Sequence, residues 1–206
     1  MKRPTADFGL SQEQKMIREG VIALLEKAMP RERIQQMDEE RQFPFEAYQA
    51  LADAGWMGLP HEQEYGGSDG SYKDLAIFVE SAAYYNAQLA SAYLTTVIYG
   101  GMQVRYGASP ELKSQILPGM IAGDIRLALC ITEPETGSDV ASIRTRAVQD
   151  GNDYVITGQK VYITCAHVAH HLVVATKTDP SAGHKGISLF LVDVRSPGVS
   201  IRPLKG

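Results

Sequence analysis

Apolar residues recur at helical spacing in the first part of the chain. The earliest apolar face follows an i, i+4, i+7, i+8 pattern and consists of Ile17, Val21, Leu24 and Leu25. Ser11 is a suitable N-cap residue, and Gln14, three positions later, is suited to complete a capping box. Pro30 interrupts the pattern. The sequence therefore predicts a helix between Ser11 and Pro30.

Four further helices follow from the same kind of pattern. The first of them starts after Pro44 and stops near Gly55, and Ser71 can cap the next one. A longer helix is expected from about Ala87 to Tyr106, and its many Leu, Tyr, Val and Ile residues predict burial on most sides. Ser109-Pro110-Glu111 combines a cap, a first-turn proline and an acid, so it predicts another helix start.

The apolar period changes from helical to alternating after Gly123. Residues 125–131 alternate between branched apolar side chains and smaller or polar ones, which predicts a strand. Asp150-Gly151-Asn152-Asp153 is a tight-turn sequence. Further strand-like runs are Ile143–Val148, Tyr154–Thr157, Val161–Thr164, Leu172–Thr176 and Ile187–Val194.

A run of helices followed by a run of strands predicts two packed domains rather than a doubly wound sheet. We expect an α+β multidomain protein. Its all-α helical N-terminal domain spans residues 1–123, and an antiparallel, β-barrel-like domain spans residues 124–206.

Composition narrows the class of protein. Of 206 residues, 44% are hydrophobic, and the formal net charge of -4 argues against a nucleic-acid-binding protein. Two thiols, Cys130 and Cys165, fit a reducing compartment better than a disulfide framework. The first eight residues lack the apolar core of a signal peptide, and no apolar run is long enough for a membrane span. We therefore expect a cytoplasmic protein.

The segment Leu129–Asp139 carries the clearest candidate chemistry. It places Pro134 and Gly137 after a predicted strand, and Gly137 permits a backbone conformation that other residues resist. Thr132 and Ser138 supply hydroxyl groups that can bind the polar edge of a ligand. Judged by spacing alone, the segment also fits an ordinary polar turn without a ligand.

Other chemically active side chains have simpler interpretations. His167, His170, His171 and Cys165 cluster in sequence, but no matching ligand set accompanies them, so we expect no metal site. The acids Glu133, Glu135 and Asp139 are interpreted as hydrogen-bonding residues of the loop rather than as a general base. Four cations are interpreted mainly as solvated: Arg144, Arg146, Lys160 and Lys185.

Four segments in the right order resemble the acyl-CoA dehydrogenase family. The most specific is the signature Thr132-Glu-Pro-Glu-Thr-Gly-Ser-Asp139. Tyr154–Thr164 resembles the family's second flavin-contact strand, and Gly58–Gly67 resembles its "Pro-Glu-Glu-Tyr-Gly-Gly" loop. Asp193–Ile201 resembles a later strand entry. The resemblance extends from about Leu10 to the last residue.

The resemblance implies a site for FAD that is not of the Rossmann type, and the chain has no dinucleotide-binding glycine motif. By resemblance, Thr132 faces the pyrimidine side of the flavin, Thr164 lies near flavin N5, and Tyr162 stacks beside the ring where many members have Trp. Ser138 contacts both cofactor and substrate, and His184 lies near the CoA moiety. The implied cofactor-binding residues are Leu129, Ile131, Thr132, Gly137, Ser138, Tyr162, Ile163 and Thr164.

The implied reaction is the α,β-dehydrogenation of an acyl-CoA thioester, with electron-transfer flavoprotein as the electron acceptor and a homotetramer as the full-length assembly. In the family the catalytic Glu comes from a C-terminal domain. We therefore expect a β domain truncated before its usual end, no catalytic residue in this chain, and no turnover by the chain alone.

Two other functions remain open at this stage. One is a flavin-dependent monooxygenase on the same fold, and the other is a non-catalytic binding or scaffold module.

Overall fold

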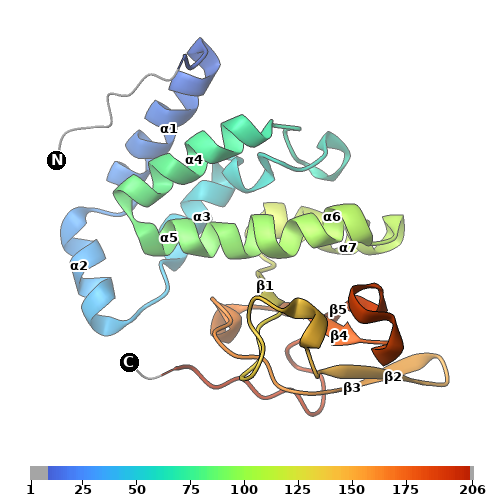
Figure 1. Ribbon diagram of the computed structural model, residues 1–206. Helices are drawn as coiled ribbons and strands as arrows, with labels where there is room; N and C mark the ends of the chain where they lie inside the picture. Colours follow the sequence, from blue (N-terminus) through green and yellow to red (C-terminus); the bar gives the residue numbers. More distant parts are fainter. Residues whose placement is uncertain (1–8, 205–206) are drawn as a thin grey trace. The chain divides into compact units, whose positions relative to one another are not determined.

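Helices fill the first part of the chain and strands the last, in a computed structural model that describes residues 9–204 (Figure 1). The chain divides into two compact units between Tyr93 and Leu94. We call them the helical unit and the sheet unit. Residues 1–8, to which the signal-peptide prediction refers, lie outside the described residues, as do residues 205–206.

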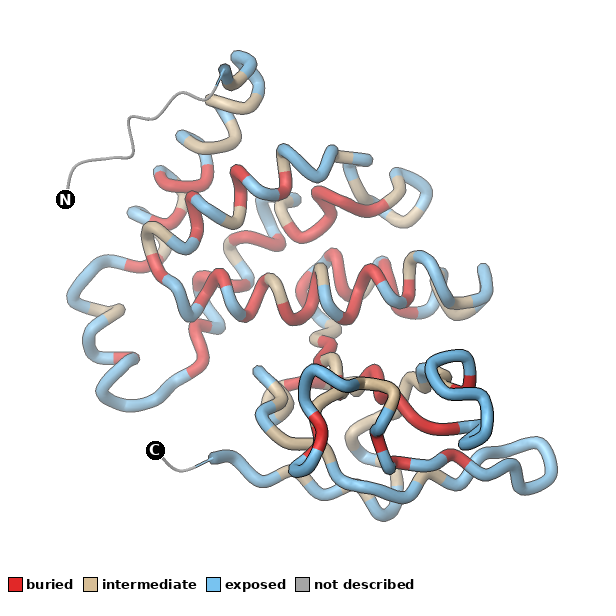
Figure 2. Tube along the Cα trace, viewed as in Figure 1, coloured by how far each residue is buried: buried red, intermediate tan, exposed pale blue. Residues whose placement is uncertain are grey.

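The helical unit contains five α-helices and two short 3₁₀ turns within its described residues. Helix α1 packs against α4 and α3, and α4 packs against α5. Their facing sides supply a buried core that includes Val21, Leu25 and Phe78, shown by the red segments of Figure 2. The elements are α1 Gln12–Ala28, α2 Arg31–Glu40, α3 Phe45–Asp53, η1 Trp56–Gly58, η2 Gln63–Tyr65, α4 Tyr72–Tyr85 and α5 Ala87–Tyr93.

The predicted helix starts are confirmed at the level of individual caps. Ser11 and Gln14 form the expected capping box at the start of α1. Ser71 forms a second one with Asp74 at the start of α4. These reciprocal bonds satisfy N–H groups that a helix leaves unpaired at its first turn, so they fix where each helix begins.

Helix α2 was not predicted from the sequence. Met37 is its one buried residue, so the helix has almost no apolar face to reveal it. Side-chain pairs one turn apart support it instead: Gln35 donates to Glu39 at 3.3 Å and Gln36 donates to Glu40 at 2.8 Å.

The sheet unit begins with helical segments that precede its first strand. The π-helix η3 spans Leu94–Gly100, α6 spans Gly101–Gly107 and α7 spans Pro110–Ile121. Helix η3 packs on strand β1, Leu127–Cys130. The approach is so close that a Cβ atom on Gly100 would lie 2.4 Å from the Cβ atom of Leu127. The Thr96 hydroxyl also donates to the Leu127 carbonyl at 3.3 Å.

Strand β4, His171–Lys177, organises the five-stranded sheet. It pairs in parallel with β1, in parallel with the start of β2 at Arg146, and antiparallel with β5. Strands β2 and β3 form an antiparallel hairpin across the predicted turn at Gly151. The other strand bounds are β2 Arg146–Asp150, β3 Asp153–Thr157 and β5 Ile187–Asp193.

The expected order of a helical part followed by a β part is confirmed, but the sheet is mixed, whereas we expected an antiparallel one. The long segment from Ile131 to His170 separates β1 from β4, and such a crossover permits parallel pairing. In residues 9–204 the sheet does not close into a barrel. The predicted domain boundary at Gly123 stays a prediction. No helix within the described residues is long and apolar enough to cross a membrane.

Candidate functional site

The signature segment folds into a tight turn directly after β1. Glu133 and Thr136 exchange backbone hydrogen bonds at 2.9 and 3.1 Å, which places Pro134 and Glu135 at the exposed tip. Thr132 is half-buried, and Gly137 and Ser138 are exposed. The turn therefore exposes polar groups to solvent, and the two backbone hydrogen bonds between Glu133 and Thr136 hold it in place.

Glu133 is the buried anchor of this turn, with 6% of its surface exposed. Its carboxylate accepts hydrogen bonds from the backbone N–H groups of Arg144 and Thr145 at 2.6 and 2.9 Å, and from the Thr145 hydroxyl at 2.6 Å. Lys160 Nζ lies 2.8 Å from the same carboxylate. Burial alone raises the pKa of Glu133, but these bonds outweigh it and lower the pKa to about 2.

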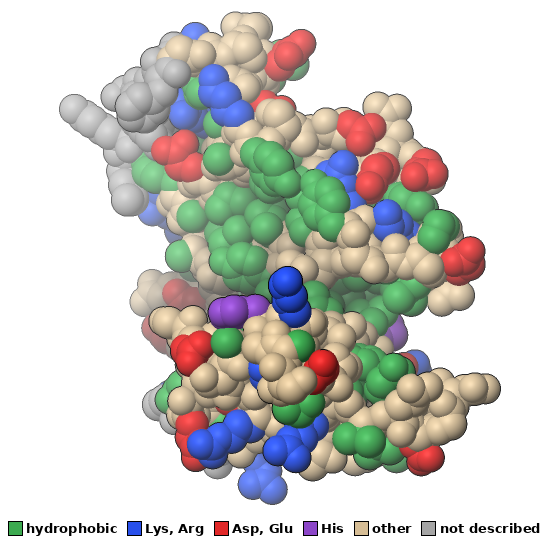
Figure 3. Space-filling view, turned by 45° about the vertical axis from the view of Figure 1, so that its right-hand side comes forward, with side chains coloured by type: hydrophobic (Ala, Val, Ile, Leu, Met, Phe, Trp, Pro, Cys, Tyr) green, Lys and Arg blue, Asp and Glu red, His purple; other side chains and the backbone are tan. Residues whose placement is uncertain are grey.

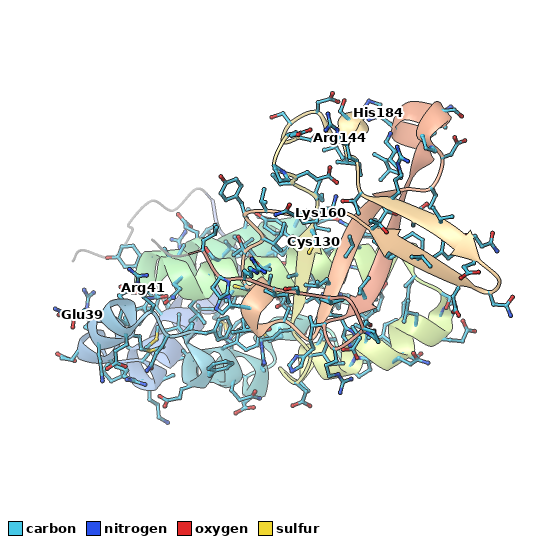
Figure 4. The ribbon with its side chains drawn as sticks, turned by 90° about the horizontal axis from the view of Figure 1, so that it is seen from below. Glu39, Arg41, Cys130, Arg144, Lys160 and His184 are labelled. Carbon is cyan, nitrogen blue, oxygen red and sulfur yellow. The ribbon has the colours of Figure 1, made fainter. Side chains whose placement is uncertain are left out.

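Lys160 links the turn to the second flavin-contact segment predicted from the sequence. Its ammonium group also donates to the Ile131 carbonyl at 2.9 Å, and the neighbouring Val161 N–H donates to the Thr132 carbonyl at 2.9 Å. The side chain of Lys160 is only 9% exposed. The interpretation of Lys160 as a solvated cation is wrong, because its long apolar stem carries the charge to a buried partner. Figure 4 shows Lys160 near Cys130.

The run Val161–Thr164 was predicted to be strand-like, and that prediction is wrong. Tyr162 adopts a left-handed backbone conformation with φ of 58°, and Cys165 follows with φ of 60°. Non-glycine residues rarely adopt such angles, and they persist where the surrounding structure enforces them. Tyr162 is 75% exposed, so its aromatic ring is accessible to a ligand.

Five of the eight predicted cofactor residues lie on two segments that hydrogen bonds join, and the others lie apart from them. The backbone bond from Val161 to Thr132 and the side-chain bond from Lys160 to Ile131 place Ile131 and Thr132 beside the start of the segment Tyr162–Thr164. Leu129 lies within β1, paired with Val173, and is half-buried. Gly137 differs from expectation: its φ is not positive and a Cβ atom would meet nothing within 4 Å. Neither the backbone conformation nor close packing therefore requires glycine at residue 137.

The two predicted substrate contacts, Ser138 and His184, are both exposed. Ser138 lies shortly before the helical turn η4, Val140–Ser142, and His184 lies within the helical turn η6, Pro180–Gly186; the two turns pack against each other. Figure 3 shows several Lys and Arg side chains on the part of the surface formed by the sheet. Arg144, which pairs with Glu135, and His184 lie at the same end of the sheet unit in Figure 4.

The histidine segment has a structural explanation in hydrogen bonding. His170 Nδ1 accepts from the backbone N–H of Arg126 at 3.0 Å, and Arg126 Nε donates to the Val168 carbonyl at 2.8 Å. Burial and the charge of Arg126 lower the pKa of His170, which favours the neutral ring. Among residues 9–204, no three His, Cys, Asp or Glu side chains are arranged to hold a metal ion.

The arrangement fits a flat ligand with a polar edge. Thr132 and Thr164 offer hydroxyl groups, the adjoining backbone offers N–H and carbonyl groups, and Tyr162 offers an aromatic face. An isoalloxazine ring has this combination of a planar face and hydrogen-bonding edge atoms, so the donor set is compatible with FAD. The burial of the Lys160 side chain cannot be read from the sequence, because a lysine after Gly158-Gln159 resembles any loop cation.

Comparisons with known proteins give two family-model matches that together span most of the chain. Residues 11–124 match the family model described as acyl-CoA dehydrogenase, N-terminal domain, and residues 128–206 match the corresponding middle domain. Acyl-CoA dehydrogenase FadE29 of Mycobacterium tuberculosis is 34% identical over 95% of this chain and 50% of its own length. The CarC subunit of the caffeyl-CoA reductase–Etf complex of Acetobacterium woodii is 34% identical over 93% of this chain and 50% of its own.

Solved structures show the same fold. The FAD complex of PigA superposes with a TM-score of 0.87 at 26% identity, covering 94% of this chain and 51% of that one. The glutaryl-coenzyme A dehydrogenase glutaryl-CoA complex superposes with a TM-score of 0.87 at 28% identity, covering 94% and 50%. The chain spans about half the length of the curated relatives it matches.

Proposed function

The chain belongs to the acyl-CoA dehydrogenase family, and we propose that its sheet unit carries the FAD-contacting part of a site for the α,β-dehydrogenation of an acyl-CoA thioester. One observation carries the proposal: hydrogen bonds join the segments Ile131–Glu133 and Lys160–Val161. The candidate hydroxyl groups and the one aromatic ring lie on these segments or directly after them. Bound FAD supplies the hydride acceptor for such a reaction.

The residues of this chain orient the cofactor in the proposed site. Thr132 and Thr164 bind polar atoms along the flavin edge, and Tyr162 covers part of the ring. The smaller area of tyrosine, compared with the tryptophan of many family members, weakens the stacking without removing it. The likeness to the FAD complex of PigA supports this cofactor.

Acyl-CoA is the proposed substrate, and the likeness to the glutaryl-CoA complex supports a CoA thioester. Ser138 contacts cofactor and substrate in this proposal, and His184 contacts the CoA portion. Lys185 is an exposed cation next to His184, and it adds favourable charge for the phosphate groups of CoA.

The general base is proposed to come from outside residues 9–204. Glu133 is fully engaged in hydrogen bonds with a pKa of about 2, so it is too weak a base for this task. Glu135 pairs with Arg144, and Asp139 accepts from the Ser142 hydroxyl. An acidic residue contributed by a C-terminal domain, as the family resemblance implies, completes the proposed site.

Partners and location follow from the same family assignment. We propose that electron-transfer flavoprotein reoxidises the flavin of the complete enzyme, which the likeness to a subunit of a reductase–Etf complex supports. We also propose a homo-oligomeric assembly and a cytoplasmic location. Two cysteines without a disulfide support the cytoplasmic location.

Titration of the 206-residue chain with FAD tests the cofactor proposal directly. Saturable quenching of flavin fluorescence is expected. The Thr132→Val/Thr164→Val double variant should weaken binding by about tenfold, because two hydrogen bonds to the cofactor are lost. Thr157→Val, an exposed threonine of β3, serves as the matched control and should bind FAD like the unmodified chain. Equal affinity of the double variant and the control would contradict the assigned residues.

A second titration, with acyl-CoA added to the FAD-loaded chain, tests the substrate contacts. His184→Gln should weaken acyl-CoA binding and leave FAD affinity unchanged, because the proposed contact is with CoA alone. A parallel loss of both affinities would show that His184 supports the fold of the site and does not contact substrate.

A further inference from the structure

The Glu133–Lys160 pair joins three chain segments that are distant in sequence. Lys160 Nζ is bound to the Ile131 carbonyl at 2.9 Å and to the Glu133 carboxylate at 2.8 Å. The same carboxylate receives the backbone N–H groups of Arg144 and Thr145. Residues 131–133, 144–145 and 160–161 are therefore held around one buried ion pair.

The pair is next to the residues proposed to contact the flavin, both in sequence and through hydrogen bonds. Thr132 stands between the two groups that Lys160 binds, and its own carbonyl accepts from the Val161 N–H. Tyr162, with its left-handed backbone, follows two positions after Lys160. A backbone angle of this kind persists only where the neighbouring residues are held in place. The hydrogen bonds of Lys160 hold the chain on the N-terminal side of Tyr162.

Stability alone does not account for the pair. Well-packed apolar side chains often stabilise a protein as well as a buried ion pair does. Apolar side chains cannot, however, bind a backbone carbonyl of one segment and two backbone N–H groups of another. The pair is thus suited to setting the geometry of the three segments relative to one another.

We propose that Glu133 and Lys160 are positioning residues, which hold Thr132 and the Tyr162–Thr164 segment in the arrangement that binds FAD. The flavin part of this inference rests on the proposed function. The geometric part, that the pair sets the backbone at Val161 and at residues 144–145, rests on the hydrogen bonds alone.

Hydrogen exchange and FAD titration of four variants of the 206-residue chain test the inference. Lys160→Met removes the ammonium group and leaves Glu133 buried with an unbalanced charge. Glu133→Gln/Lys160→Met removes both charges and keeps one acceptor oxygen, which can serve the N–H group of Arg144 or of Thr145 but not both. Lys160→Arg keeps a charged donor. Lys177→Met is the matched control, because Lys177 is also buried and donates to a backbone carbonyl, that of Gly183 at 2.9 Å.

Lys160→Met should speed exchange of the Val161 amide and raise the Kd for FAD, each by about tenfold or more. The double variant should recover thermal stability towards that of the unmodified chain because no uncompensated charge stays buried, yet its FAD affinity should remain weak. Lys160→Arg should restore part of the affinity. Lys177→Met should leave Val161 exchange and FAD affinity unchanged.

Two results overturn the inference. The first is a double variant that regains FAD affinity together with stability, since the pair would then act only through stability. The second is unchanged Val161 exchange in Lys160→Met, which would show that the pair does not set the local backbone. If the unmodified chain itself binds no FAD, the proposed function fails for the isolated chain, and the exchange at Val161 alone supports or overturns the geometric part.

Discussion

Glu133 and Cys130 lie three residues apart, and burial affects their acidity in different ways. Burial raises the pKa of the Cys130 thiol to about 12, and the nearby charge of Lys160 offsets only part of this rise. For Glu133 the hydrogen bonds outweigh burial and the pKa falls to about 2. The difference lies in the partners, because four donors face the carboxylate whereas the thiol makes one weak contact with the Ala128 carbonyl.

The Glu133 carboxyl should make the stability of the chain sensitive to acid. Its pKa in the folded state, about 2, lies below its ordinary value of 4.5. The unfolded chain therefore binds the proton first. The stabilisation is complete above pH 4.5 and is lost as the pH falls from 4.5 towards 2, and it amounts to about 3 kcal/mol. Denaturant unfolding at a series of pH values measures this effect.

Glu133→Gln should flatten this part of the stability profile, because the amide does not titrate. Glu135→Gln is the control, since the carboxylate of Glu135 and the guanidinium of its partner Arg144 are both exposed. If the free energy of unfolding fell equally with pH in Glu133→Gln and in the unmodified chain, other carboxyl groups would be responsible for the loss of stability in acid.

The Cys130 thiol should be nearly inert in the folded chain. With a pKa of about 12, its thiolate fraction at pH 8 is lower than in the unfolded chain by a factor on the order of a thousand. Alkylation by iodoacetamide, followed by mass spectrometry of the peptides, should label Cys130 only after denaturation. Cys165→Ser removes the second thiol and isolates the measurement. Rapid labelling of Cys130 in the folded chain would contradict its burial.

The sequence suggests some candidate site residues and conceals others. Thr132, Ser138, Tyr162 and Thr164 are candidates because they belong to motifs that specify residue types at fixed spacing, and their contacts with a ligand stay a prediction. The role of Lys160 depends on its partner Glu133, which is distant in sequence, so local pattern did not reveal it. The left-handed angle at Tyr162 was also hidden, because tyrosine gives no local signal for such a conformation.

Individual elements show which competing effects decided the outcome. Strand β1 was predicted from alternation, yet Ala128 and Cys130 on its second face are buried as well as Leu127. Helix η3 packs on this strand, and a parallel partner lies beside it. Strands covered on both faces lose the alternation that distinguishes a half-exposed strand. The small side chains of Ala128 and Cys130 were the one feature of the β1 sequence that indicated close packing on its second face.

Gly100→Ala should destabilise the chain because η3 and β1 have no room for a methyl group. A Cβ atom at residue 100 would lie 2.4 Å from the Cβ atom of Leu127, so the backbone of one element must move. Overpacking of this kind costs about 1–3 kcal/mol, which denaturant unfolding can measure.

Gly107→Ala is the matched control for that substitution. Gly107 is the last residue of α6, and a Cβ atom there would meet nothing within 4 Å. Alanine should be neutral or stabilise the helix by up to about 1 kcal/mol. Similar losses for the two variants would indicate that the helix backbone, and not the contact with Leu127, is responsible.

For the molecule as a whole, the order of helices and strands followed from the change in apolar period near Gly123. The two compact units meet between Tyr93 and Leu94, because helical residues 94–121 pack with the strands, as the contact between Gly100 and Leu127 illustrates. Periodicity describes local structure and does not by itself define a domain, so the domain boundary at Gly123 stays a prediction.

Binding and catalysis should separate in the 206-residue chain. The described residues offer hydroxyl groups and an aromatic face for FAD, but their signature acids are committed to hydrogen bonds or ion pairs. Proton abstraction next to the thioester requires a carboxylate whose pKa is closer to neutral than that of Glu133. We therefore expect FAD binding without measurable acyl-CoA oxidation in an assay with an artificial electron acceptor. Turnover within the usual enzymatic range of about 1–10³ s⁻¹ would show that this chain itself supplies the base; Glu133→Gln and Glu135→Gln would then identify which acid acts.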